Sequence, residues 1–424
     1  MIEHTPAAQE DRYPPFSPWI RRVLWIFAIT ALAVSCFLGF RYSAIHLSDF
    51  TGYYSAAKIL ATHDSPANIY DDDWFKHKVR SFDIAESTFV MYVNPPPVSF
   101  IMLPLTPLRP FHAKLVWNIL TLSLLFLAFF LMRKPFGLVG HSGYEALLLA
   151  TLCTVPLMRN LQRGQIYVML LVIAVFLWRG YIGKQTWVVG VSLASLLLMK
   201  YFGWLFIPLL LTERRWKELG ATLLCAILGF ALSVAVLGLT TYERHIEELS
   251  TAIRNMDTAF TGLPCVPAFF GSLFVYHPRW NPYPVAHIPW LATFLSTASL
   301  GFCLILTLRR RRALKKREHS IFFSVLVLSV IFTPLAADHH YMLLVPPVFF
   351  MLSGINWIEI HVARVLAICV LVYAILGWLP ARPASLENGW MKLLSFPHLY
   401  AAVFLWYLLL FTENRFLMKT NDAV

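Results

Sequence analysis

Residues 23–40 read VLWIFAITALAVSCFLGF, and Asp49 follows them at the head of the segment DFTGYYSAAKIL. The first stretch holds no charged residue and is long enough to cross a bilayer as a helix, which takes roughly 17–25 apolar residues. A carboxylate that follows such a span faces the membrane surface, where it is a candidate general base. The two segments therefore predict a membrane anchor with a reactive acid beyond its far end.

Composition extends this prediction to the whole chain. Hydrophobic residues make up 58% of the sequence and charged residues 14%, and the mean hydropathy is +0.62. Because a water-soluble surface needs more charge than this, the chain is predicted to be an all-α polytopic membrane protein. No small-residue cleavage site follows residues 23–40, and many apolar segments do, so the first segment is expected to remain as an anchor.

Apolar segments predict roughly ten to twelve transmembrane helices within a single domain, residues 23–412. They lie near residues 23–40, 113–132, 145–158, 166–178, 186–199, 202–212, 219–239, 288–308, 320–335, 341–355, 362–379 and 396–412. Segments 186–199 and 202–212 are too short for two regular spans, so we expect them to be tilted, broken or re-entrant, with Lys200 at their junction.

Lysine and arginine predict the orientation, because basic residues concentrate in the short cytoplasmic loops of membrane proteins. They gather here at Arg21-Arg22, Arg133-Lys134 and Arg309 to Arg317. The tails at residues 1–22 and 413–424 are then cytoplasmic, in a cell (inner or plasma) membrane. The net charge of +12 is a topology signal, and nucleic-acid binding is excluded because the Arg309 block lies between two spans.

Two large loops, near residues 41–112 and 240–287, are exterior in this orientation, and function is expected there because the cytoplasmic connections are short. The first loop is predicted to carry an amphipathic helix in the headgroup plane, since one helical stripe holds Tyr53, Ala57 and Leu60.

Two further motifs of the first loop allow more than one interpretation. Asp71-Asp72-Asp73 could bind Mg²⁺ or Mn²⁺, or could begin a helix before Trp74. The run Asn94 to Pro97 is expected to be a rigid loop that shapes a site, because consecutive prolines fix φ and remove hydrogen-bond donors.

The ordered set of motifs resembles a known family. The motifs are, in chain order, Asp49-Phe50, Tyr53-Tyr54 with Ala56-Ala57, Ile69 to Asp71, Tyr92 to Pro96, Gly164-Gln165, Lys200 and Glu213 to Lys217. In order and spacing they resemble glycosyltransferase family 87, whose members include polyprenol-phosphate-mannose-dependent α-1,2-mannosyltransferases and related arabinosyltransferases. The resemblance extends over residues 20 to about 345. It implies the fold of the C-type membrane glycosyltransferases, with extracytoplasmic loops that carry the site.

The resemblance also implies an activity. A mannose or a related sugar would be transferred with inversion from a polyprenyl-phosphate donor to a glycolipid or polysaccharide acceptor at the extracytoplasmic face. Partners would be these two substrates and membrane lipids. No cofactor is implied, and the family is generally taken as independent of metals. The chain carries neither a Walker motif nor a Rossmann fingerprint, which agrees with a lipid-linked rather than a nucleotide-linked donor.

Asp49 is the candidate catalytic residue. An acceptor hydroxyl must lose its proton as it attacks the anomeric carbon, so a carboxylate within hydrogen-bond reach is needed. The alternative is that Asp49 only caps the helix that begins near Tyr53. The resemblance favours the base.

The remaining candidates are substrate-binding residues: Tyr53, Tyr54, Arg159, Arg163, Gln165, Lys200, His339 and His340. A histidine pair is frequent at this place in the family, and histidine can donate to phosphate and titrate near neutral pH. A cation such as Lys200 at the end of an apolar segment is costly unless it serves a partner, although it could also simply snorkel. Arg159 and Arg163 are expected in a loop, where they bind phosphate or are merely exposed.

Two other classes of protein remain possible from the sequence. A transporter or flippase needs polar groups inside several spans, and the spans here are nearly free of charge between their ends. A structural or assembly membrane protein needs no reactive acid. Both alternatives predict that Asp49 is dispensable.

Overall fold

The computed structural model describes residues 16–84, 94–255, 263–313, 318–355, 357, 360–378 and 384–412, and their regular secondary structure is entirely helical. The predicted all-α polytopic membrane class is confirmed. Most of the two expected tails, residues 1–15 and 413–424, lies outside the described residues. Helix α1 begins at Pro18, so it already includes residues that were expected in the first tail.

The helices of the first half of the chain are α1 (Pro18–Ser43), α2 (Phe50–Ala61), η1 (Pro66–Tyr70), α3 (Asp72–Arg80), η2 (Pro96–Leu105), α4 (Pro110–Arg133), α5 (Ser142–Leu152), α6 (Val155–Arg163), α7 (Tyr167–Ile182), α8 (Thr186–Lys200) and α9 (Phe206–Thr212). Those of the second half are α10 (Trp216–Leu237), α11 (Leu239–Asn255), α12 (Val266–Phe274), α13 (Pro289–Ala313), α14 (Glu318–Ile331), η4 (Asp338–Leu344), α15 (Val345–Ser353), α16 (Val362–Leu376), η5 (Ala384–Glu387), η6 (Gly389–Ser395) and α17 (Pro397–Phe411).

Fewer helices than expected are long enough to cross a membrane alone. In the described part of the chain, α1, α4, α10 and α13 meet the length and hydropathy that a span needs, and η6 with α17 forms a fifth candidate that is bent by 57°. Several segments counted among the ten to twelve expected spans are shorter apolar helices, namely α7, α8, α14 and α16. Such pieces cross a bilayer only where other protein elements cover their ends.

Two of the expected spans are broken. Residues 145–158 were expected to form one span, but α5 ends at Leu152 and α6 starts at Val155. Pro156 explains the restart, because proline lacks the N–H that a helix interior needs and is well accepted in a first turn. Residues 186–212 are also broken, as expected, and the break follows Lys200 at Tyr201, whose φ is +54°.

The amphipathic helix predicted for the first loop is α2, but it lies within the protein rather than on a surface. Residues 50–57 and Ile59 are all buried, because α2 packs against η2, η1 and α4. Lys58, the one charged residue of α2, donates from Nζ to the carbonyl oxygen of Thr106 at 2.7 Å. The helix therefore belongs to the interior of the protein.

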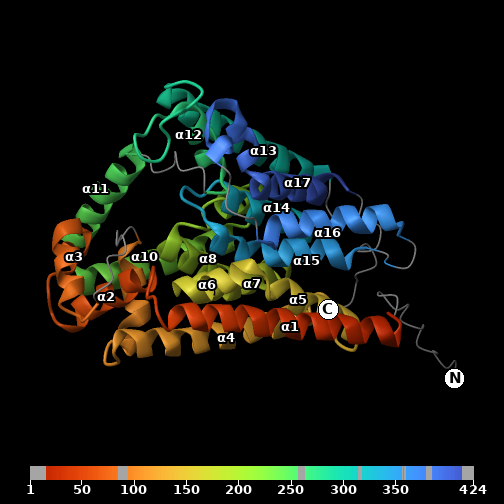
Figure 1. Ribbon diagram of the computed structural model, residues 1–424, viewed down its shortest axis with the longest axis horizontal. Helices are drawn as coiled ribbons and strands as arrows, with labels where there is room; N and C mark the ends of the chain where they lie inside the picture. The colour runs from red at the N-terminus through yellow and green to blue at the C-terminus, as the bar shows by residue number, and fades with distance from the viewer. Residues whose placement is uncertain are drawn as a thin grey trace.

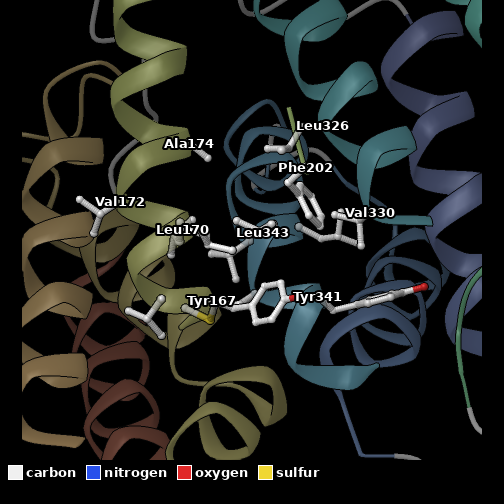
Figure 2. Close-up of a cluster of buried hydrophobic side chains, with 14 of the residues drawn as sticks. Tyr167, Leu170, Val172, Ala174, Phe202, Leu326, Val330, Tyr341 and Leu343 are labelled. Atoms are coloured by element: carbon white, nitrogen blue, oxygen red, sulfur yellow. The ribbon is translucent and has the colours of Figure 1, made fainter. Parts of the chain in front are cut away.

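The long helices enclose a continuous apolar core. Figure 1 shows α1 and α4 side by side along one edge, with α2 and α3 at the opposite end of α1 from the N-terminus. We call this end the site end. Helix α14 lies deep inside, since every residue from Ser320 to Ile331 is buried, which fits a helix that is apolar all round. Figure 2 shows side chains of α7, α14 and η4 filling the space between these elements, with Tyr167 and Tyr341 at its lower edge.

Candidate active site

Asp49 lies in the turn between α1 and α2, after Ser48, whose φ is +53°. It occupies the N-cap position of α2, yet its side chain makes no capping hydrogen bond. Instead Oδ2 accepts from Nε2 of Gln165 at 2.7 Å and lies 3.6 Å from Nη1 of Arg163. The carboxylate side chain is 41% exposed. It is thus held by a side chain at the end of α6 and by that of Gln165, which follows the C-terminal cap, while one part of it stays open.

Gln165 orients the carboxylate. The hydroxyl of Tyr53 donates to Oε1 of Gln165 at 2.7 Å, so the amide nitrogen is left to donate to Asp49. Gln165 also accepts at its backbone oxygen a hydrogen bond from the Trp117 indole of α4, at 3.3 Å. Helices α2, α4 and the end of α6 are joined through this one residue.

Gly164 allows α6 to end against α2. Its φ is +65°, in the left-handed region that glycine adopts without a steric cost. A Cβ at this position would lie 2.6 Å from Cβ of Phe50, the residue that follows Asp49. Only glycine permits this approach.

Arg159 and Arg163 lie on helix α6, so the loop expected for them is wrong. They are one helical turn apart and on the same face. Arg163 lies beside Asp49, whereas Nε of Arg159 is 3.9 Å from Oδ2 of Asp338 at the start of η4. Helix α6 thus places one guanidinium near each of the two carboxylates.

The histidine pair lies against α6 and α7. Nδ1 of His340 accepts from the Ala337 backbone N–H at 3.0 Å, so Nε2 must carry the proton of the neutral ring and donate to the Tyr167 hydroxyl at 2.6 Å. The backbone oxygen of His339 accepts from Nδ2 of Asn160 at 3.2 Å. Nδ1 of His339 is buried and has no hydrogen-bond partner among the residues that the structure describes.

Both histidines are neutral in this environment. Burial lowers the pKa of His339 and of His340 well below the ordinary value, and nearby cations, among them Lys200 and Arg163, lower the pKa of both rings further. Titration near neutral pH, which the sequence suggested, is therefore wrong for this pair. The rings can act as neutral hydrogen-bonding groups.

Lys200 lies between the two halves of the site. Its ammonium donates to Oδ1 of Asn94 and lies 5.6 Å from the ring centres of both Tyr53 and Tyr167. Two aromatic faces stabilise a cation at such a place. Because Tyr53 belongs to the Asp49 network and Tyr167 to the His340 network, Lys200 joins them into one site.

Two sequence candidates lie elsewhere. The Tyr54 hydroxyl donates to the backbone oxygen of Leu108 at 2.7 Å and takes no part in the Asp49 network. Asp71 accepts from the Trp74 backbone N–H at 3.0 Å and caps α3. This supports the helix start that was one of the two interpretations of the triple aspartate.

Sequence reasoning missed Tyr167, Asn160 and Lys114. Asn160 accepts from the Tyr167 backbone N–H at 3.1 Å and so ties the start of α7 to α6. Lys114 is fully buried on α4, although the segment around it predicts only a plain span. The one available signal was its charge within an apolar run, which is rare in membrane helices unless it has a purpose.

The fold and the site define an α-helical membrane protein with a polar, partly open cluster where several helices end. Residues 92–337, more than half of the chain, match the model of glycosyltransferase family 87, and the chain belongs to this family. The match contains Asn94, Arg159, Arg163, Gln165 and Lys200, whereas Asp49 and the histidine pair lie outside it. No curated protein matches the chain.

Proposed function

We propose that this glycosyltransferase moves a sugar from a polyprenyl-phosphate donor to a hydroxyl of a glycolipid or polysaccharide acceptor, with inversion and with Asp49 as general base. One observation carries the proposal: the Asp49 carboxylate makes no capping bond, remains partly exposed, and is oriented by Gln165 beside basic side chains. A carboxylate that served only as a helix cap would instead bind the backbone N–H groups of α2.

The reaction needs one displacement. Asp49 accepts the proton of the acceptor hydroxyl while the hydroxyl oxygen forms its bond to the anomeric carbon. The bond from that carbon to the phosphate oxygen breaks, and the phosphate leaves with the bonding electron pair. Because attack and departure occur on opposite faces of the sugar, the configuration is inverted.

The leaving phosphate needs positive charge and hydrogen-bond donors rather than a protein acid. Arg163 and Lys200 provide charge on the two sides of the site, and a guanidinium can bind two phosphate oxygens at once. His339 offers a buried ring nitrogen that no described residue pairs with, and a bound phosphoryl or sugar group would satisfy it. Tyr167 accepts from His340 and so keeps its own hydroxyl proton for donation.

An apolar groove supports a lipid-linked donor. A cavity of about 790 Å³ lies between α12, α13, α14 and α17, and its lining is largely aromatic and aliphatic. Its wall on α14 and just beyond includes Ile331 and Phe332, from which the chain continues to the histidine pair. A polyprenyl chain is apolar and flexible, so the groove suits it.

The charge distribution favours an orientation in which the site end is on the extracytoplasmic side of the cell membrane and the first and last residues of the chain are in the cytoplasm. Mannose or a related hexose or pentose is the sugar that the family relationship favours. The alternative of a transporter or flippase has less support, since membership in a glycosyltransferase family favours transfer of a sugar over its translocation.

The test compares Asp49→Asn with Asp71→Asn at matched protein levels in membranes. The assay is transfer of radiolabelled mannose from polyprenyl-phosphate-mannose into membrane glycolipid. Loss of a general base costs roughly 10²-fold to 10⁴-fold in rate, so we expect Asp49→Asn to keep only this small residual rate and Asp71→Asn to keep its activity. An active Asp49→Asn enzyme contradicts the mechanism, and an inactive Asp71→Asn enzyme restores the metal hypothesis.

A further inference from the structure

Lys114 is a buried cation where two helices end and a third begins. It lies in the first turns of α4 and is 0% exposed. Its ammonium donates to the backbone oxygens of His46 at 2.5 Å, Leu47 at 2.9 Å and Gln162 at 2.7 Å. An ammonium group has three N–H donors, so the three carbonyl groups match its hydrogen-bonding capacity.

The carbonyl groups come from the two segments that form the Asp49 side of the site. His46 and Leu47 lie in the turn that leads from α1 to Asp49, and Gln162 lies in the last turn of α6, next to Arg163. Gln162 presents its backbone oxygen in the last turn of α6, where unpaired carbonyls and the helix dipole favour a cation. His46 and Leu47 present theirs in the turn just beyond the end of α1. Lys114 thus connects the turn that carries Asp49 to the helix that carries its neighbours.

The turn needs such a connection. Ser48 has φ +53°, a conformation that non-glycine residues adopt rarely and at a cost. The carboxylate of Asp49 reaches Gln165 only if the turn stays close to the end of α6. The close contact of Gly164 with Phe50 is one of the contacts that fix this separation. The Lys114 ammonium binds the same two segments through the backbone oxygens of His46, Leu47 and Gln162.

We propose that Lys114 is a positioning residue that holds the Asp49 turn in register with Arg163 and Gln165. The inference rests on the proposed role of Asp49. Lys114 donates to backbone groups rather than to substrate, so its removal is expected to lower the rate of the chemical step and to leave donor binding largely intact. A buried lysine that only stabilised the fold would lower the amount of folded enzyme without changing the rate of each molecule.

The experiment uses Lys114→Met, which keeps the length and apolar stem but removes the charge and the donors. Thr121→Val on the same helix is the matched control, because Thr121 is also buried and its hydroxyl donates within α4, to the backbone oxygen of Trp117. Rates are measured per folded enzyme in nanodiscs with radiolabelled polyprenyl-phosphate-mannose. Hydrogen exchange of the backbone amides of residues 44–52 is followed by mass spectrometry.

For Lys114→Met we expect kcat to fall roughly 10²-fold, as a shift of about 1 Å at a reacting group can cause, with KM for the donor within about threefold of wild type. Exchange in residues 44–52 should accelerate, and Thr121→Val should change neither quantity. In an Asp49→Asn background the Lys114→Met change should cause no further loss, since residues that act through one group are not additive.

Two results would overturn the proposal. One is a normal kcat with normal hydrogen exchange in Lys114→Met. The other is a double variant whose loss of kcat equals the product of the losses in Lys114→Met and Asp49→Asn. An active Asp49→Asn enzyme contradicts the proposed function instead. In that case hydrogen exchange in residues 44–52 of Lys114→Met alone shows whether Lys114 positions the turn. If Lys114→Met does not fold, Lys114→Gln is measured with the same criteria, and its two remaining donors should give a smaller loss of kcat.

Discussion

Replacing Gly164 with alanine tests whether the contact between α6 and α2 sets the position of Asp49. The new Cβ would lie 2.6 Å from Cβ of Phe50. Because that atom is attached directly to the backbone, no change of rotamer relieves the clash. Carbon atoms pack at about 3.5–4.0 Å, so the backbones of α2 and of the α6 end must separate by about 1 Å.

This separation acts directly on the proposed base. Phe50 follows Asp49 in the chain, so the carboxylate moves with it and away from Gln165 and Arg163. A displacement of about 1 Å can cost roughly 10²-fold in rate. The left-handed backbone conformation costs an alanine a further ~1–2 kcal/mol of folding free energy. We expect Gly164→Ala to lose about 10²-fold in kcat/KM and to be modestly destabilised.

Gly389→Ala is the matched control. Gly389 also has a positive φ, of +48°, but a Cβ added there would meet no atom of the described part of the chain within 4 Å. It therefore carries the conformational cost without the clash. Transfer from polyprenyl-phosphate-mannose and thermal unfolding are measured for both variants at matched protein levels. A rate for Gly164→Ala within about threefold of wild type, or equal losses in both variants, would refute the reasoning.

Two further predictions follow from single side chains. Tyr53→Phe removes the hydrogen-bond donor to Gln165 and should lower the transfer rate about threefold to tenfold, in line with roughly 0.5–1.5 kcal/mol for one hydrogen bond. Tyr54→Phe is the control and should keep the wild-type rate in the same assay. Burial lowers the pKa of His245 from 6.5 to about 4. As the pH falls, the unfolded chain therefore binds a proton at this residue before the folded protein does. Folding stability is full above about pH 6.5 and declines as the pH falls toward 4. Thermal unfolding across that pH range should show a smaller decline for His245→Asn and an unchanged decline for the exposed His63→Gln. An unchanged decline in His245→Asn would contradict the role of His245 in this pH dependence.

The class of the protein could be predicted from its sequence because hydrophobic composition acts over the whole chain. Whether a single helix is buried could not be predicted in the same way. The stripe of Tyr53, Ala57 and Leu60 predicted a surface helix, but α2 is covered on almost every side. Apart from Lys58, its opposite face is made mostly of small and weakly polar residues such as Thr51 and Ser55, and such residues fit an interior as well as an interface. The elements packed against α2, among them η1, η2 and α4, decide between these places.

The candidate site was predictable in part. Order along the chain pointed to Asp49, Gln165 and Lys200, and the structure brings these side chains into one network. Tyr167 and Lys114 were missed because nothing in a tyrosine within an apolar run, or in a lone lysine, indicates its partner. Their contacts join residues far apart in the chain, and such contacts depend on how the helices pack.

The many short helices and the polar site have one cause. In hydrocarbon every backbone polar group must be paired, so the middle of a span favours neither charge nor irregular backbone. Reactive groups therefore belong at helix ends, and α6 ends at Arg163 while α8 ends at Lys200. Breaks after Leu152 and Lys200 create more such ends within the protein than uninterrupted spans would supply. The breaks that reduce the number of regular spans thus also provide places where cations and carboxylates can converge on one substrate.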